Sequence, residues 1–287
     1  MKKTSLKAPA KINLGLSILR KLPNGYHEVK TIYVQISLFD LLSFKEIKEN
    51  KIIIDCNSKA IPINYKNLVY QAAWWLKKET RVKKGIRIRL KKNIPVGSGL
   101  GGGSSDAAVV LKELNNFWHL NLSKNKLISI AKNIGADVAY HLVGGTQLET
   151  QGGEKAGRFI ALNKLPPCYI LLCVPDIRLE SSQEYSWVKY DVIGKNSLEL
   201  LIKALASGDL AKISANLHND FELWVLEKYP LIRKIKEEMI KYGALNSLMS
   251  GKGSAVFGIF DSLKKAKLAQ DYFKQSCYKI FLVRPGI

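Results

Sequence analysis

Residues 95–108 read Pro95-Val96-Gly97-Ser98-Gly99-Leu100-Gly101-Gly102-Gly103-Ser104-Ser105-Asp106-Ala107-Ala108, with five glycines in seven residues just before a helix start. Because glycine has no Cβ, such a backbone can wrap a phosphate group. The helix that follows directs its first N–H groups and its positive dipole end toward the same anion. A flexible linker would not need a helix start directly after it. We therefore predict that residues 95–105 bind the phosphates of a nucleoside triphosphate.

The segments around this loop alternate between strand and helix patterns. In residues 10–18, apolar side chains recur at every second position, which predicts a half-buried strand. Leu22-Pro23-Asn24-Gly25 is a strong turn signal before the next strand. Up to residue 143 we predict strands at 10–18, 31–44 and 85–90 and helices at 67–79, 104–118 and 123–133, followed by a helix stop at Gly135 and a new helical segment.

The composition changes around residues 144–158, where Gly-Gly recurs and the apolar periodicity lapses. We place the boundary between two domains there and predict domains at 1–157 and 158–287. The second domain is predicted to contain strands at 168–174 and 278–283, helices at 196–206, 209–226, 230–242 and 262–275, and a loop that leads into a strand across 247–260. This order indicates an α+β fold with antiparallel strands backed by helices.

The composition excludes several other classes of protein. The 287 residues are 47% apolar, and no run of about eighteen apolar residues could span a bilayer. The N-terminus lacks an apolar signal core, which predicts a cytoplasmic protein with no membrane partner. The four cysteines show neither CxxC nor Cys/His ligand spacing, so we predict neither a zinc site nor a disulfide framework.

The net charge of +21 is the largest deviation in the composition. It is compatible with a polyanionic ligand such as a nucleotide, with nucleic acid, and with a lysine-rich solvated surface. The basic residues are spread along the chain and do not form one tail. A basic RNA-binding protein would explain the charge but not the glycine loop, so we predict no nucleic-acid partner.

Known phosphate motifs fit the loop poorly. A P-loop requires a lysine after its last glycine, and Gly102 is followed by Gly103 and Ser104. The spacing of Gly97, Gly99 and Gly102 satisfies GxGxxG, but no acidic residue lies about twenty residues further on, as a dinucleotide fold needs. The protein-kinase motifs are absent as well. A dinucleotide-dependent oxidoreductase therefore stays a weaker alternative, which NADH titration would exclude.

The loop resembles the phosphate-binding signature of the galactokinase, homoserine, mevalonate and phosphomevalonate (GHMP) kinase superfamily. Three further segments carry the resemblance over residues 8 to 258: Pro9-Ala10-Lys11-Ile12-Asn13-Leu14 with Asn24-Gly25-Tyr26-His27-Glu28, Gly135-Ala136-Asp137-Val138, and Met249-Ser250-Gly251-Lys252-Gly253-Ser254. Together they are similar to the branch whose acceptor is a cytidine-diphosphate-linked sugar alcohol. Two positions depart from that pattern, Ala139 in place of a proline and Lys252 inside the last glycine loop.

The resemblance implies a fold, an activity and cofactors. It implies an N-terminal ATP domain like domain 2 of ribosomal protein S5, a ferredoxin-like C-terminal substrate domain and an active site between them. It also implies ATP-dependent phosphorylation of the 2-hydroxyl of a diphosphocytidyl methylerythritol in the non-mevalonate isoprenoid pathway, with Mg²⁺ as the expected metal. The runner-up is a sister kinase acting on mevalonate, homoserine or a sugar. The oligomeric state, monomer or homodimer, stays open.

Two residues are predicted to be catalytic. Asp137 begins a helical segment where its carboxylate would lie near the incoming phosphate, although an ordinary helix N-cap is an equal alternative from the sequence alone. Lys11 could be a solvated charge at a strand edge. The resemblance implies instead that Lys11 points into the cleft, pairs with Asp137 and favours its ionised form. Asn13 would hold substrate hydroxyls, and Ser105 is a candidate Mg²⁺ contact.

The cytidine end of the substrate is assigned through the resemblance. Tyr26 would stack on the cytosine and His27 would read its polar edge, whereas a packed turn lid is the alternative. Tyr185 falls where the family places an opposing aromatic residue, and Ser181 where it places a small hydroxyl. Residues 250–253 are either a second backbone nest, for the substrate diphosphate, or an ordinary β-turn.

Overall fold

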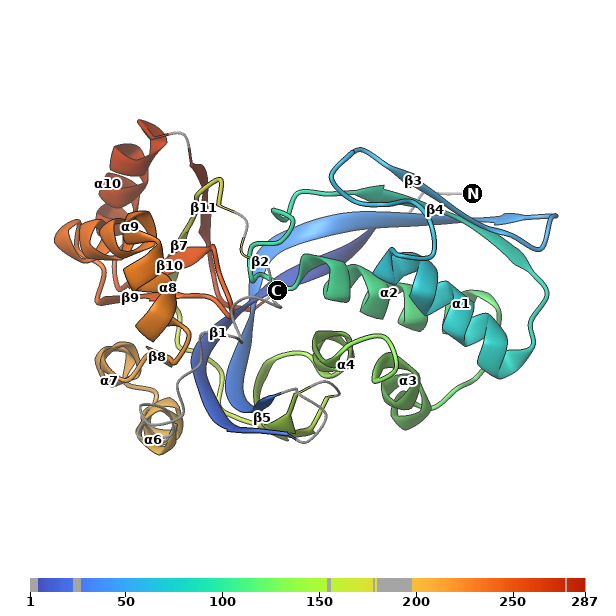
Figure 1. Ribbon diagram of the computed structural model, residues 1–287, viewed down its shortest axis with the longest axis horizontal. Coiled ribbons are helices and arrows are strands. Elements are labelled where there is room, and N and C mark those ends of the chain that lie inside the picture. The colour runs from blue at the N-terminus through green and yellow to red at the C-terminus, as the bar shows by residue number, and fades with distance from the viewer. Residues whose placement is uncertain are drawn as a thin grey trace.

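The computed structural model describes residues 5–22, 27–153, 156–177, 179, 198–276 and 278–286 (Figure 1). Within these residues, seven strands form one sheet and four form another. Figure 1 shows the helices α1–α4 gathered beside the first sheet and α8–α10 beside the second. The predicted division at residues 157 and 158 stays a prediction.

The first sheet is built on two long antiparallel strands, β1 (Leu6–Lys21) and β2 (His27–Ile47). Its main path has the order β3-β4-β2-β1-β8, and β5 joins it by pairing with both β2 and β6. The remaining strands are β3 (Ile52–Cys56), β4 (Gly85–Lys91), β5 (Thr146–Gly152), β6 (Arg158–Ala161) and β8 (His218–Asn219). The long β1–β2 ladder is the frame on which the candidate site residues are placed.

Four helices pack against the first sheet: α1 (Leu68–Thr80), α2 (Gly102–Phe117), α3 (Lys124–Ala131) and α4 (Ala136–Val143). The N-caps of α1 and α3 follow from the sequence, because the side chains of Asn67 and Ser123 accept hydrogen bonds from backbone N–H groups of the first turn. The apolar faces of these helices share one core with Leu42, Ile86 and Ile88 of the sheet.

The second sheet has the order β11-β7-β10-β9, and all of its neighbouring strands are antiparallel. Its strands are β7 (Tyr169–Val174), β9 (Asn246–Met249), β10 (Val256–Phe260) and β11 (Lys279–Val283). The helices of this region are α6 (Glu199–Ser207), α7 (Leu210–Ala215), α8 (Glu222–Lys228), α9 (Pro230–Lys241) and α10 (Leu263–Lys274). Helices connect β7 to β9 and β10 to β11, whereas a short turn connects β9 to β10. This connection pattern, with the strand order given above, matches the predicted ferredoxin-like arrangement.

Strand β1 is buried on both faces, which differs from the half-buried strand predicted from its alternation. Ile12 and Leu14 contribute to a core shared with β7, β10 and α6, whereas Leu16 and Ile18 belong to the core around α9 and α10. The polar residues between them, including Lys11 and Asn13, are buried as well. A polar face that is buried needs internal partners, and the candidate active site supplies them.

Two predicted segments differ in the structure. The single helix predicted over 209–226 is divided into α7, β8 and α8, because Asp220 accepts a hydrogen bond from the N–H of Ile18 and ties this segment to β1. Residues 144–158 contain β5, whose Thr146, Leu148 and Glu149 pair with β2. Periodicity analysis of the sequence missed this strand because Leu148 is its only large apolar residue.

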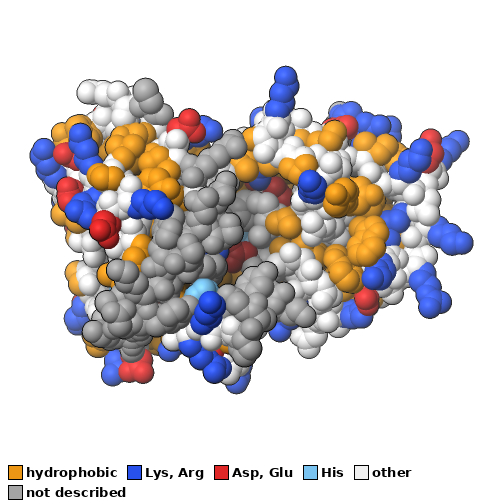
Figure 2. Space-filling model, in the orientation of Figure 1, with side chains coloured by type: hydrophobic (Ala, Val, Ile, Leu, Met, Phe, Trp, Pro, Cys, Tyr) orange, Lys and Arg blue, Asp and Glu red, His pale blue; other side chains and the backbone are white. Residues whose placement is uncertain are grey.

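The surface is rich in lysine and arginine side chains, which are scattered over the face drawn in Figure 2 with acidic side chains among them. The described part of the chain contains no helix long and apolar enough to cross a membrane.

Candidate active site

The glycine loop leads into α2 as the sequence predicts. Gly97, Gly99 and Gly101 have φ angles of 68°, 79° and 68°, which glycine adopts without strain. Gly101 is the N-cap residue of α2, and no side chain caps its first turn. The N–H groups of that turn are therefore available to an anion, at the positive end of the helix dipole.

The loop is fixed in place by backbone hydrogen bonds from both sheets. The N–H of Lys11 donates to the carbonyl of Leu100 at 3.0 Å, and the N–H of Ala255 donates to the carbonyl of Ser98 at 3.0 Å. The hydroxyl of Ser250 donates to the carbonyl of Gly99 at 3.1 Å. The loop is thus held between β1 and the turn that joins β9 to β10.

A buried charge cluster attaches the start of α2 to the sheet. The ammonium of Lys92 contacts the carboxylates of Asp40 and Asp106. Asp40 also accepts hydrogen bonds from the N–H groups of Asn93 and Ile94. Burial raises the pKa of Asp106 to about 8, against the opposing effect of Lys92. Burial therefore favours the protonated form of Asp106 relative to an exposed aspartate.

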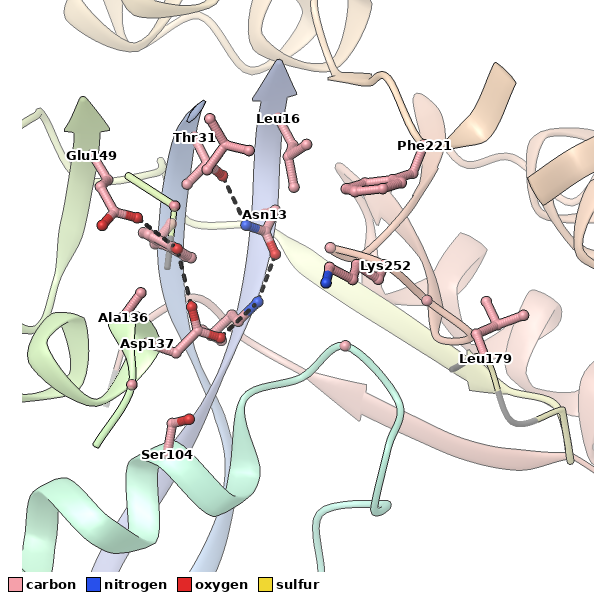
Figure 3. Close-up of a pocket in the computed structure, with 18 of the residues that line it drawn as sticks. Asn13, Leu16, Thr31, Ser104, Ala136, Asp137, Glu149, Leu179, Phe221 and Lys252 are labelled. Carbon is pink, nitrogen blue, oxygen red and sulfur yellow. Dashed lines mark hydrogen bonds and ion pairs between the residues drawn. The ribbon is translucent and has the colours of Figure 1, made fainter. Parts of the chain in front are cut away.

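Lys11 lies beside both Asn13 and Asp137, and the latter two residues are labelled in Figure 3. The ammonium of Lys11 donates to Oδ1 of Asn13 at 2.7 Å and lies 3.5 Å from Oδ2 of Asp137. Asn13 donates to the hydroxyl of Thr31 at 2.8 Å, and Thr31 donates to the carbonyl of Gly15 at 2.7 Å. The side chain of Lys11 is 5% exposed and that of Asp137 is 32% exposed. The carboxylate is therefore more accessible from the cavity than the ammonium group.

Asp137 is held in its ionised form. Burial by itself would raise its pKa, but the charge of Lys11, the neighbouring His141 and a hydrogen bond from Tyr33 together lower the pKa below the ordinary aspartate value. Burial also lowers the pKa of His141 to about 4, so this imidazole is neutral near pH 7. A carboxylate that is ionised, partly exposed and next to an ammonium group can accept a proton from a bound hydroxyl.

These residues line a cavity of about 390 Å³ between the two sheets. In Figure 3, Asp137, Asn13 and Thr31 lie on one side of it, and Lys252, Phe221 and Leu179 on the other. Other residues that line it are Lys11, Leu16, Val29, Tyr33, Gly97, Gly99, Ser104, Gly135, Ala136, Glu149, Gly153, Gly251 and Gly253. The cavity therefore brings together the glycine loop, the Lys11–Asp137 pair and the turn at residues 250–253.

The predicted phosphate-binding residues divide between two cavities. Gly97, Gly99 and Ser104 line the first, whereas Pro95, Val96 and Ser98 line a second cavity of about 400 Å³ with Lys92 and Lys279. Leu100 is buried beneath the loop, and Gly101, Gly102 and Gly103 enter α2. Ser105 is buried, and its hydroxyl has no hydrogen-bond partner among the described residues. The neighbouring Ser104 is therefore better placed than Ser105 to contact a bound group.

The predicted cytidine-binding residues are described only in part. His27 is buried at the start of β2, and burial followed by the charges of Lys21 and Lys252 lowers its pKa. Its imidazole is therefore neutral near pH 7, with one nitrogen able to donate and one able to accept. Tyr26, Ser181 and Tyr185 lie outside the described residues.

Sequence analysis missed several residues that line the cavity. Thr31 and Tyr33 share a face of β2, so their two-residue spacing could have placed them beside Lys11 once the β1–β2 pairing was known. Glu149 and Phe221 carry no comparable signal, because long-range pairing alone brings them to the cavity. Among the described residues no three His, Cys, Asp or Glu side chains are grouped to hold a metal ion.

Comparison with known proteins agrees with this geometry. The GHMP kinases N terminal domain matches residues 67–145, and the GHMP kinases C terminal domain matches residues 201–279. A crystal structure of 4-(cytidine 5'-diphospho)-2C-methyl-D-erythritol kinase superposes with a TM-score of 0.84 at 30% identity, covering 99% of this chain and 100% of that one. Mevalonate kinase of Methanococcus jannaschii, at 15% identity and a TM-score of 0.75, shares the fold. The predicted two-part GHMP-kinase-like fold is confirmed.

Curated relatives narrow the class further. The 4-diphosphocytidyl-2-C-methyl-D-erythritol kinase of Listeria innocua is 41% identical over 283 residues, 99% of this chain and 96% of the relative. The enzyme of the same name from Caldicellulosiruptor bescii is 41% identical over 278 residues, 96% of each chain. The chain is a GHMP kinase and belongs to the family of 4-diphosphocytidyl-2-C-methyl-D-erythritol kinases.

Proposed function

We propose that the chain transfers the γ-phosphoryl group of ATP to the 2-hydroxyl of 4-diphosphocytidyl-2-C-methyl-D-erythritol, a step toward isoprenoid precursors in the non-mevalonate pathway. The observation that carries this proposal is the ion pair between Lys11 and Asp137 in the cavity beside the glycine loop. The relatives at 41% identity, which are named for this acceptor, support the choice of substrate.

The proposed chemistry needs few groups, because phosphoryl transfer depends mainly on positioning and on charge stabilisation. Asp137 accepts the proton of the attacking hydroxyl as that oxygen bonds to the γ-phosphorus and ADP leaves. Lys11 keeps Asp137 ionised beforehand and stabilises the negative charge that develops during transfer. Asn13, fixed by Thr31, orients the acceptor hydroxyl.

Magnesium would enter with ATP, because this ion usually keeps most of its ligands from phosphates and water and takes only one or two from the protein. Two serine hydroxyls lie at the start of α2: that of Ser104, which lines the cavity, and that of Ser105, which has no hydrogen-bond partner in the part of the chain that the structure describes. Asp106 next to them is committed to Lys92. A bound Mg²⁺ would neutralise charge on the β- and γ-phosphates.

For the cytidine end we propose that Tyr26 and Tyr185 stack on the base, that His27 reads its polar edge and that Ser181 contacts the substrate. A neutral His27 supplies both a donor and an acceptor for that edge. Competition by CDP, CMP and UDP against the acceptor measures this selectivity. Equal inhibition by CDP and UDP would remove the cytosine assignment, and His27→Ala should reduce the difference between them.

An ADP-release assay over four acceptors tests the proposal as a whole. Diphosphocytidyl-methylerythritol, mevalonate, homoserine and galactose are supplied at equal concentration with MgATP. We expect turnover with the first alone. Turnover with mevalonate, homoserine or galactose in its place would favour a sister kinase.

We further propose an ATP-binding N-terminal domain at 1–157, a substrate domain at 158–287 and a cytoplasmic protein that is a monomer or homodimer.

A further inference from the structure

Behind Asp137 lies a second carboxyl group that the proposed mechanism does not use. Glu149 on β5 has no exposed surface, and its Oε2 lies 2.9 Å from the phenol oxygen of Tyr33. The same phenol oxygen lies 3.0 Å from Oδ1 of Asp137. In Figure 3 dashed lines mark these two contacts, one at Glu149 and the other at Asp137.

The number of protons that Glu149, Tyr33 and Asp137 can share is limited. A phenol has one proton and can donate it to one of its two carboxyl neighbours. If both carboxyl groups were ionised, one carboxylate would face a phenol oxygen that offers it no proton, which is costly in a buried site. One of the two carboxyl groups must therefore carry a proton and donate it to the phenol oxygen.

The surroundings decide which carboxyl group is protonated. Asp137 has the Lys11 ammonium 3.5 Å from its other oxygen, whereas the other oxygen of Glu149 receives a single backbone hydrogen bond from Gly157 at 2.9 Å. Burial raises the pKa of Glu149 and outweighs the hydrogen bonds from Gly157 and Tyr33, which lower it. The charge of Asp137 adds a smaller increase, and the charge of Lys11 opposes it. The proton therefore belongs to Glu149.

We propose that Glu149 is a positioning residue for phosphoryl transfer: its protonated carboxyl group donates to the phenol oxygen of Tyr33 and so directs the phenol proton to Oδ1 of Asp137. This inference rests on the proposed role of Asp137 as proton acceptor. With Oδ1 engaged by Tyr33, Oδ2 is the oxygen that faces Lys11 and the incoming hydroxyl. Tyr33 itself is fixed by stacking on Tyr140, with ring centroids 4.4 Å apart.

Ionisation of Glu149 as the pH rises would reverse the arrangement. The charged and titratable groups that face Glu149 are Tyr33 from β2, Asp137 from α4 and Lys11 from β1, and His141 lies beside Asp137. Ionised Glu149 would attract the phenol proton and leave Oδ1 of Asp137 without its donor. We therefore expect kcat to fall as the pH rises through the pKa of Glu149.

The test compares Glu149→Gln with Glu149→Ala in steady-state kinetics over a range of pH. Glutamine keeps a donor toward Tyr33 at every pH, so E149Q should lack the alkaline decline. E149A should show a kcat about tenfold below that of E149Q, the rate equivalent of one hydrogen bond, with the KM for ATP little changed. Equal kcat values for the two folded variants, or an alkaline decline that persists in E149Q, would overturn the proposal.

Infrared difference spectroscopy provides a readout that needs no substrate. The difference spectrum of wild type minus E149Q should contain the C=O stretching band of the protonated Glu149 carboxyl group, separate from any band of Asp106. This readout also covers the case in which E149A fails to fold. Asp106→Asn is the matched control, because burial raises the pKa of the Asp106 carboxyl group as well, to about 8. No band difference between wild type and E149Q would refute the protonated state of Glu149, whatever the acceptor proves to be.

Discussion

Two glycine-rich turns face each other in this molecule, and only one of them is followed by a helix. The glycine loop at residues 97–103 leads into α2, whereas the turn at residues 250–253 joins β9 to β10. Both use glycines with positive φ, 79° at Gly99 and 57° at Gly251. The first turn has helix N–H groups and a dipole to offer an anion, and the second has instead a lysine, Lys252, which points into the cavity (Figure 3).

The difference suggests a division of labour between the two turns. Backbone groups at a helix start can hold the phosphates of ATP without a charged side chain, but a turn between two strands has only a small dipole. Lys252 would therefore supply the positive charge for an acceptor that carries its own diphosphate. Lys11 lies between the two turns, because a Cβ at Gly101 would lie 3.1 Å from its Cε and one at Gly251 would lie 3.4 Å from its Nζ.

The largest effect is expected at the pair between the turns. Asp137→Asn should lower kcat by roughly two to four orders of magnitude while ATP and acceptor still bind, because the proton acceptor is lost. Isothermal titration and ADP release measure the two quantities separately. If the folded variant kept more than about a tenth of wild-type activity, Asp137 would have a structural role.

Lys11→Ala should lose activity to a similar extent and also change the pH profile. Without the ammonium group, Asp137 loses the largest of the effects that lower its pKa, so its pKa rises. Since the ionised carboxylate is the active form, the acid limb of the rate profile should move to higher pH. An acid limb at an unchanged pH would show that Lys11 does not control the ionisation of Asp137.

The contact between the two turns should depend on Gly99. A Cβ there would lie 2.1 Å from the carbonyl oxygen of Ser250, and the φ of 79° disfavours any other residue. Gly99→Ala should therefore cost about 2 to 4 kcal/mol in the free energy of unfolding, measured in urea. Gly97→Ala is the matched control, with a similar φ but nothing within 4 Å of its Cβ, and should cost about 1 to 2 kcal/mol. Equal losses would mean that the turns are not tightly packed.

Lys252→Ala tests whether the second turn binds the acceptor. The KM for the diphosphocytidyl acceptor should rise about tenfold or more, because a charge-assisted hydrogen bond to a phosphate is lost. The KM for ATP should change much less. Lys264→Ala removes an exposed lysine on α10 and controls for net charge. A larger rise in the KM for ATP would transfer Lys252 to the nucleotide site.

Gly103→Ala separates ATP binding from folding in the first turn. The new Cβ would be 3.6 Å from Leu68, an ordinary contact, and alanine favours the helix by about 0.5 to 1 kcal/mol. Stability should hold or rise, while a phosphate close to the backbone would meet the methyl group and the affinity for ATP should fall. Gly101→Val is less informative, because its Cβ would also lie 2.9 Å from His141 and 3.0 Å from Lys11. Unchanged ATP affinity in G103A would move the phosphates away from this turn.

Local sequence patterns predicted the elements that depend on local chemistry. The glycine loop, its helix and the helix that begins after Gly135 follow from residues that are neighbours in sequence. Gly135 is the N-cap of α4, so the alternative of Asp137 as an ordinary N-cap is wrong. Periodicity alone left Lys11 as a possible solvated charge at a strand edge. The resemblance to the kinase superfamily is what predicted that Lys11 belongs to the site. The burial of both faces of β1 and the meeting of Glu149 with Tyr33 depend on which strands pair, and alternation within one strand does not contain that information.

The most direct test of the account is to follow the phosphoryl group itself. Phosphorus NMR of a reaction with MgATP and diphosphocytidyl-methylerythritol should show one new phosphomonoester for each ADP formed, attached at the 2-hydroxyl and absent from the Asp137→Asn reaction. Release of inorganic phosphate with the acceptor unchanged, or a phosphomonoester at another hydroxyl, would contradict the arrangement of ATP and acceptor around Lys11 and Asp137.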